Sequence, residues 1–347
     1  MQARIVKGLL VAGALLCACG SDRPAALTSV RTISVGLNLN ALEGNGDVLG
    51  VSYTDVSNTG STTGFRETLH LYKYQSVTPD DLLDLGNVYL GVDTLYHRVP
   101  HISFSADWAA VTIDFNDGPK GWVGLVSLGG AAPSLAATLP LNYVVDGALA
   151  AGRWLLVVGG QRLDLFDLVN SSSPSLIKTF TSAGPVTAFT VVADGFIVFT
   201  DSGYGHLVPD STNATYSETP DTTLRSFRKA YTYAGQAYVA GPSPLAGKSR
   251  IARLDLRDPG RPALALSLDV EGNFVGFGYD GSSRYFLELT GNDLGDRALV
   301  YREDQAGLTL VANGLMRPWF GGGVSRLFAR NGHVYLLDRG LGIYRLP

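Results

Sequence analysis

A strand, a proline turn and a second strand recur along the chain, and this recurrence limits the fold more than any other feature. The clearest copy is Gln161–Gly184, in which alternating apolar residues flank the turn at Pro174. Similar units lie at Gly121–Leu141 and Ser249–Gly272, and a looser one lies at His70–Leu90. Proline fixes φ and has no N–H to donate, so it suits a turn and not a strand ladder. Each unit is therefore predicted to be a β-hairpin.

A second pattern, an apolar segment followed by a tight turn and another apolar segment, occurs seven times. The turn glycines at positions 152, 195, 235, 281 and 332 are 43, 40, 46 and 51 residues apart. Repeats of about 40–50 residues built from four short strands are typical of β-propellers. We therefore predict an all-β fold, a seven-bladed β-propeller of four-stranded blades. The third strands should centre on Tyr72, Leu125, Phe166, Leu207, Leu254, Tyr301 and Tyr344.

The sequence also predicts how the ring closes. Pro347 comes directly after the seventh third strand, so the last blade lacks an outer strand of its own. Counting back from the first turn by the spacing of the other blades leads to Leu27–Ile33, which looks like a strand. This N-terminal strand is expected to pair with the last blade and to cover an otherwise open edge. An irregular fourth unit, giving six or eight blades, is the alternative.

The N-terminus has the features of an export signal. Arg4 and Lys7 precede an apolar run, Gly8–Ala18, that is too short for a membrane span of about 20 residues. The sequence Leu16-Cys17-Ala18-Cys19 resembles the lipobox of bacterial lipoproteins. The resemblance implies cleavage before Cys19, a lipid on Cys19 and, with Gly20 next, sorting to the outer membrane. The alternative is an ordinary signal peptide with incidental cysteines.

The expected organisation is a lipoprotein signal peptide at 1–18, a lipid-anchored tether at 19–26 and a propeller domain at 27–347. No cysteine follows Cys19, so burial and not a disulfide must stabilise the domain. Removal of Arg4 and Lys7 changes the formal charge from −4 to −6. The chain is mildly acidic and has no Lys/Arg cluster, so no nucleic-acid partner is expected. The expected membrane association comes from the lipid.

The proline-turn units resemble the LVIVD-type propeller repeats of bacterial surface and secreted proteins. The likeness is clearest at Gly121–Leu141, Gln161–Gly184 and Ser249–Gly272. It is weak at His206–Arg225, which lacks the turn proline at the expected offset, and at Arg297–Gly314, where Gly307 replaces it. The resemblance implies a propeller fold and a location at the cell envelope, and it carries no catalytic motif.

In a propeller, the links between blades and the loops between second and third strands lie on one face, here called the channel face. This is the usual ligand site of the fold, an inference by analogy. Aromatic rings offer large contact area with few torsions, so we expect a protein, peptide or glycan to contact aromatic and charged residues of the links. The candidates are Tyr96, His97, Arg98, Tyr143, Phe227, Arg228, Phe274, Arg317 and Trp319. Alternatively, several of these rings fill the space between blades.

The sequence offers no assembled catalytic or metal group. His97 and His101 have the spacing of helical metal ligands, but Val99-Pro100 between them argues against a helix. No Gly-x-Ser-x-Gly motif and no free cysteine point to a nucleophile. We therefore expect a monomeric binding or scaffold module without a cofactor or metal. The alternative is a hydrolase or lyase of surface glycans that uses acidic residues around the channel.

Overall fold

The computed structural model describes most of the chain between Ala25 and Leu346. The described stretches are 25–26, 28–33, 39–44, 47–59, 62–75, 82–93, 97–115, 121–130, 132–233, 236–271, 273–280, 283–290, 296–304, 307–316, 327–330, 332–338 and 340–346. In these stretches no helix is long and apolar enough to cross a membrane. Of the candidate residues, Cys19, Tyr96, Arg317 and Trp319 lie outside the described part of the chain.

Three four-stranded antiparallel sheets come from the first half of the chain. The first contains β3 (Leu39–Gly44), β4 (Val48–Thr59), β5 (Thr62–Tyr74) and β6 (Leu82–Asp93). The second contains β7 (His97–Phe104), β8 (Trp108–Phe115), β9 (Gly121–Ser127) and β10 (Ser134–Leu141). The third contains β11 (Gly147–Ala151), β12 (Trp154–Gly159), β13 (Arg162–Asp167) and β14 (Ser175–Thr181). In all three, neighbours in the chain are neighbours in the sheet.

Two further four-stranded sheets and one nine-stranded sheet follow. The four-stranded sheets are β15 (Val186–Val192), β16 (Gly195–Thr200), β17 (Gly203–Val208) and β18 (Thr215–Pro220), then β19 (Lys229–Tyr233), β20 (Gln236–Pro242), β21 (Lys248–Asp255) and β22 (Ala263–Glu271). The nine-stranded sheet includes β23 (Asn273–Asp280), β24 (Ser283–Thr290), β25 (Asp296–Asp304), β26 (Gly307–Met316), β27 (Leu327–Arg330), β28 (His333–Asp338) and β29 (Gly340–Arg345). The short strands β1 (Ala25–Ala26) and β2 (Thr28–Ile33) complete it.

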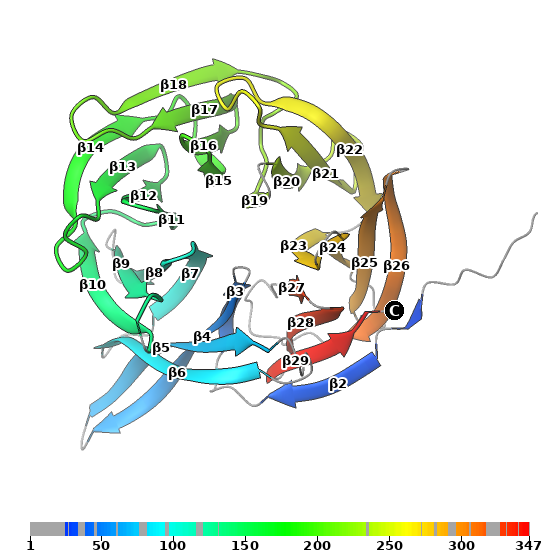
Figure 1. Cartoon of the computed structure of the whole chain (residues 1–347), viewed down its shortest axis with the longest axis horizontal. Coiled ribbons are helices and arrows are strands. Elements are labelled where there is room, and N and C mark those ends of the chain that lie inside the picture. Colours follow the sequence, from blue (N-terminus) through cyan, green and yellow to red (C-terminus); the bar gives the residue numbers. More distant parts are fainter. Residues whose placement is uncertain are drawn as a thin grey trace, which may run out of the picture.

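Figure 1 shows the sheets arranged around a ring, with β3, β7, β11, β15, β19, β23 and β27 toward the middle. The outer strands form the rim. The fold is thus all-β and propeller-like, as the sequence repeats predict. Tight turns join the first and second strands, and Gly152 and Gly332 adopt φ values of +56° and +70° in two of them. Glycine takes this left-handed conformation without strain, which explains the glycines at these two turns.

The N-terminal strand closes the ring where the sequence predicts it. β2 pairs antiparallel with β29, from Thr28 opposite Arg345 to Ile33 opposite Leu341. Just before it, Ala25 and Ala26 pair in parallel with Ala312 and Asn313 of β26. The pairing therefore begins two residues earlier than Leu27, where we expected the domain to start. The two N-terminal strands thus pair with β26 over two residues and with β29 along β2.

Outer strands share a β-bulge opposite the centre of the third strand. The ladders shift by one residue next to Tyr72, Leu125, Phe166, Leu254, Tyr301 and Tyr344, leaving Leu85, Ala136, Ile177, Ala265, Val311 and Val30 as the extra residues. Such bulges bend and twist the strand that carries them. The bulge in β2 shows that this strand sits on β29 as the other outer strands sit on theirs. The ladder between β17 and β18 shifts nowhere, which matches the weak fourth unit of the sequence.

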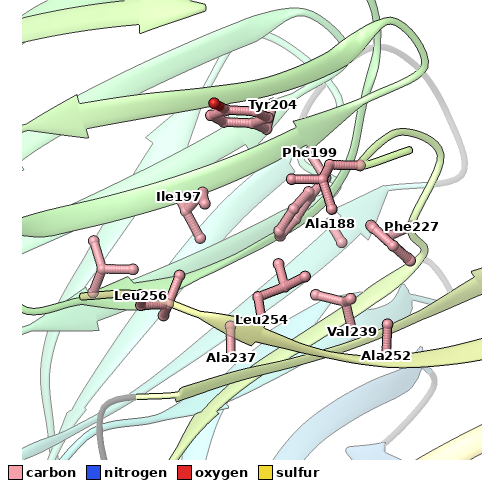
Figure 2. Packing of buried hydrophobic residues seen from close by; sticks show 12 residues of the cluster. Ala188, Ile197, Phe199, Tyr204, Phe227, Ala237, Val239, Ala252, Leu254 and Leu256 are labelled. Atoms are coloured by element: carbon pink, nitrogen blue, oxygen red, sulfur yellow. The ribbon is translucent and has the colours of Figure 1, made fainter. Parts of the chain in front are cut away.

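The hydrophobic core lies between neighbouring sheets. In one interface, Ile197 and Phe199 of β16 meet Val239 of β20 and Leu254 of β21, and all four are at most 1% exposed (Figure 2). Burial of such side chains stabilises the fold by about 1.5–3 kcal/mol each relative to full exposure. Successive residues of a strand point to opposite faces of its sheet, and both faces carry apolar side chains that pack against a neighbouring sheet. This explains why the strands are nearly continuous apolar segments separated by polar turns.

Candidate functional site

The channel face is described best at the links that lead into the third, fourth and fifth sheets. These links are residues 142–146, 182–185 and 221–228. Tyr143, Phe227 and Arg228 lie in them, as expected. His97, Arg98 and Phe274 instead belong to strands: His97 and Arg98 begin β7, and Phe274 is the second residue of β23. Only the backbone of these three residues is described.

Tyr143 fixes the first of these links to the sheet that follows. Its hydroxyl donates a hydrogen bond of 2.8 Å to Oδ2 of Asp164 on β13. The Arg162 guanidinium lies 4.7 Å from the centre of the Tyr143 ring, and any side chain at Gly159 would overlap that ring. Burial and the neighbouring Asp164 carboxylate raise the pKa of the phenol, so it remains a protonated donor. The contacts make Tyr143 an anchor for the link.

Asp164 is the centre of this anchor and was not among the site residues predicted from the sequence. Only 1% of the residue is exposed. Besides Tyr143, Arg162 Nε donates to its carboxylate at 2.9 and 3.0 Å, and Thr179 Oγ1 donates at 2.6 Å. A buried carboxylate needs such partners to offset its desolvation. The feature of the sequence that could have identified Asp164 is its position between Leu163 and Leu165 in an apolar strand.

A second carboxylate holds the link at residues 182–185. Glu218 Oε2 of β18 accepts a hydrogen bond from the backbone N–H of Ala183 at 2.8 Å. Its other oxygen accepts from Thr200 Oγ1 at 3.2 Å and from Ser202 Oγ at 3.4 Å. Tyr216 OH also donates to Glu218, at 3.3 Å. Burial and then this carboxylate raise the pKa of the Tyr216 phenol. Glu218 therefore ties a blade link to the second strand of the same sheet.

The link at residues 221–228 is held by its own backbone. Ser226 has a φ of +60° and donates its N–H to the carbonyl of Thr200 at 2.8 Å, and Arg228 N–H donates to Ala240 O at 2.7 Å. Phe227 between them is 2% exposed and packs edge to face on Phe199, with 5.4 Å between the ring centres. This buried position corrects the expectation of a ligand-facing Phe227. The ring fills the space between two sheets, and the exposed Arg228 follows it.

Two apolar side chains remain exposed on this part of the channel face. Val144 is 43% exposed beside Tyr143, and Leu245, in the loop between β20 and β21, is 53% exposed. Val144 and Leu245 are thus apolar contact points on the described channel face. Arg228 adds a positive charge, and its backbone is held by the hydrogen bond to Ala240. No group of three or more His, Cys, Asp or Glu residues in the described stretches is placed to hold a metal ion.

The first sheet contains a buried acid near its channel-face end. Glu67 of β5 is fully buried, and Thr54 Oγ1 of β4 lies 2.8 and 2.9 Å from its two carboxyl oxygens. Burial raises the pKa of Glu67 to about 7; the hydrogen bond from Thr54 opposes this shift and the nearby Asp55 adds to it. Glu67 therefore changes its charge near neutral pH.

Comparisons with known proteins support the fold alone. No protein-family model and no curated protein matches the chain. Kuenenia stuttgartiensis hydrazine synthase is similar over 91% of this chain and 98% of that one, with a TM-score of 0.53 and 12% identity. Saccharomyces cerevisiae Sqt1 is similar over 90% of this chain and 83% of its own, with a TM-score of 0.50 and 11% identity.

A third solved structure, apo AztD from Citrobacter koseri, covers 86% of this chain and 87% of that one at 11% identity, and its TM-score of 0.46 is too low to support an argument. The hydrazine synthase chain is propeller-like, in agreement with the ring of sheets seen here. Identities at this level show a shared fold and do not transfer an activity, a ligand or a partner.

Proposed function

We propose that this protein is a binding or scaffold module of the cell envelope, a seven-bladed β-propeller anchored by a lipid on Cys19. The proposed count of seven treats the nine-stranded sheet as two blades, β23–β26 and β27–β29 with β2, and each of the five four-stranded sheets as one blade. The proposal of a lipid anchor is based on the lipobox-like sequence Leu16-Cys17-Ala18-Cys19. A closed ring of this kind needs no second copy, so the proposed state is a monomer.

The observation that carries the binding role is the anchoring of the links on the channel face. Asp164 holds the link with Tyr143, Glu218 holds the link with Ala183, and Thr200 accepts the N–H of Ser226. A surface whose backbone is fixed before the partner arrives loses little conformational entropy on binding. The channel face is therefore suited to hold a protein, a peptide or a glycan through exposed side chains such as Val144 and Arg228.

The same contacts favour binding over glycan hydrolysis, which is the enzyme alternative. A glycoside hydrolase needs two carboxyl groups about 5–10 Å apart that are available to the substrate. Asp164 and Glu218 instead accept hydrogen bonds from the links and strands around them. Asp146 likewise accepts the N–H of Gly160 at 2.6 Å. These three carboxylates organise the backbone of the channel face.

A thermal-shift screen of residues 20–347 with glycans and peptides tests the binding role. A ligand at 100 times its dissociation constant adds about 2.7 kcal/mol to the stability of the folded state. The combined substitution Arg228→Ala and Trp319→Ala should abolish the shift while the unliganded melting temperature stays near that of the wild type. Val169→Ser, in the turn between β13 and β14 at the opposite end of the strands, is the matched control because Val169 is 73% exposed.

A shift that survives the double substitution would place the site elsewhere. Turnover of a glycan that gives a shift would favour the enzyme alternative. The anchor is tested separately by mass spectrometry of the mature protein and of Cys19→Ala. A lipid-sized mass increase should be present in the first and absent from the second, and light scattering of residues 20–347 should report a monomer.

A further inference from the structure

We propose that the sector of the rim formed by β25, β26, β29 and β2 is the side of the propeller that faces the membrane, in contact with lipid head groups. This inference rests on the lipid anchor proposed above and adds an orientation to it. It follows from the place where the N-terminal segment joins the ring and from the side chains exposed there.

The attachment point is fixed by backbone pairing. Ala25 and Ala26 pair with Ala312 and Asn313 of β26, and β2 continues along β29 to Ile33. The N-terminal segment thus pairs with the outer strand β26 and with the third strand β29. The bulge at Val30 shows that β2 occupies the position of an outer strand next to β29. Figure 1 shows β26 and β2 on one side of the ring and β14 on the other.

The distance from this point to the anchor is short in any conformation. Ala25 is the sixth residue after Cys19, and six residue steps span at most about 22 Å at about 3.3–3.6 Å per residue. If β1 frays, the first paired residue is Thr28, the ninth residue after Cys19, and the reach is still at most about 32 Å. The lipid therefore holds this sector close to the bilayer surface and leaves the opposite rim farther away.

The exposed charges of the sector fit a lipid surface. Among the described side chains of β2, β25, β26 and β29, the exposed charged ones are Arg31, Arg302 and Arg345. Arg302 and Arg345 lie near the ends of third strands, away from the channel face. Arginine binds phosphate well, and exposed basic side chains strengthen contact with anionic head groups. These three arginines lie far apart in the sequence, so no basic run marks the sector.

The test uses two equivalent positions on opposite sides of the rim. Thr309 of β26 directly precedes Leu310, which pairs with the third-strand centre Tyr301. Ser175 of β14 directly precedes Leu176, which pairs in the same way with Phe166. Both residues are exposed. In the lipidated full chain, Thr309→Cys and Ser175→Cys each add a reactive thiol, since no native cysteine follows Cys19. Each thiol is labelled with a fluorophore, and the protein is placed in phosphatidylethanolamine/phosphatidylglycerol vesicles that carry a head-group nitroxide lipid.

The label at position 309 should lose a larger fraction of its fluorescence than the label at position 175. Inserting about 20 Gly/Ser residues after Gly20 should remove most of this difference, because a flexible chain of that length spans about 25 Å on average and far more when extended. Equal quenching at both positions, stronger quenching at 175, or a difference that survives the longer tether would overturn the orientation. A protein without lipid on Cys19, seen by mass spectrometry, would overturn the anchor itself.

Discussion

Arg253 Nη1 lies 2.7 Å from Glu303 Oε1, and the pair joins β21 of one sheet to β25 of the next. The Glu303 side chain is only 4% exposed, and the Tyr238 hydroxyl donates to its second oxygen at 3.3 Å. Apolar side chains also pack across this interface, where Tyr301 of β25 lies against a buried cluster that includes Tyr238 and Ile251. The ion pair therefore adds a specific polar contact to an interface that hydrophobic burial stabilises.

The first prediction concerns this ion pair. Arg253→Ala should lower the free energy of unfolding by about 3 kcal/mol, because it leaves the Glu303 carboxylate buried without its cation. Arg257→Ala is the matched control, since Arg257 pairs with Asp255 on the same sheet but its side chain is 91% exposed. Such exposed pairs contribute little to stability because water and salt screen the two charges. Urea denaturation of both variants measures the difference, and equal losses would contradict the structural role of the buried pair.

The second prediction concerns the anchor of the first described link. Tyr143→Phe removes the hydrogen bond to Asp164 and should lower stability by about 1–2 kcal/mol, because a buried carboxylate loses one of its donors. Tyr89→Phe is the control at a ring that is 54% exposed, and it should leave the urea midpoint nearly unchanged. If Tyr143 serves only to contact a ligand, Tyr143→Phe will also leave the midpoint unchanged.

The third prediction is a pH dependence caused by Glu67. In the unfolded chain its carboxyl titrates near pH 4.5, and in the folded protein near 7. Between these values the folded state holds more protons, so the free energy of unfolding should fall as the pH rises. The loss is on the order of 3 kcal/mol for a shift of this size and is complete above pH 7.

Glu67→Gln tests the assignment, because a neutral amide can keep the hydrogen bond to Thr54. The variant should match the wild type near pH 4 and be more stable at pH 8. The exposed carboxylate of Asp258 offers a control, and Asp258→Asn should keep the wild-type decline between pH 4.5 and 7. An unchanged decline in Glu67→Gln would assign the effect to another group.

The fourth prediction concerns ring closure. Deletion of residues 27–33 from the chain 20–347 should lower the melting temperature and promote aggregation, because the edge of β29 and the apolar surface next to Ile33 become exposed. Deletion of residues 20–24, which precede β1, is the control and should leave the melting curve in place. An equal effect of the two deletions would contradict a specific role for β2.

The repeats in the sequence predicted the strand order well because turns and alternation are local features. Pro133, Pro174 and Pro262 precede outer strands as expected, and Leu27–Ile33 overlaps β2. The weak fourth unit was harder to interpret, because β18 is polar and no proline occupies the expected position. In the structure, the Asp210 carboxylate accepts hydrogen bonds from the N–H groups of Thr212 and Asn213 and so organises this turn.

The candidate site was predicted less well, because its side chains meet only after the sheets pack. Phe227 looked like a ligand contact from its place in a link, but the ring enters the core against Phe199. Asp164 and Glu218 are single acids in strands, and their partners in the links are 21 and 35 residues away. Neither composition nor spacing identifies such pairs, whereas the turn chemistry that builds the strands is visible within a few residues.

The pairing of Thr28 with Arg345 also determines the order in which the chain can fold. A strand made among the first residues must wait for a partner made among the last, so the closing contact spans nearly the whole chain. Contacts of such sequence separation form slowly because a very long loop must close first. A circular permutant that begins at Leu39 and carries residues 25–33 after Arg345 makes this contact local. It should refold faster and reach the same native ring.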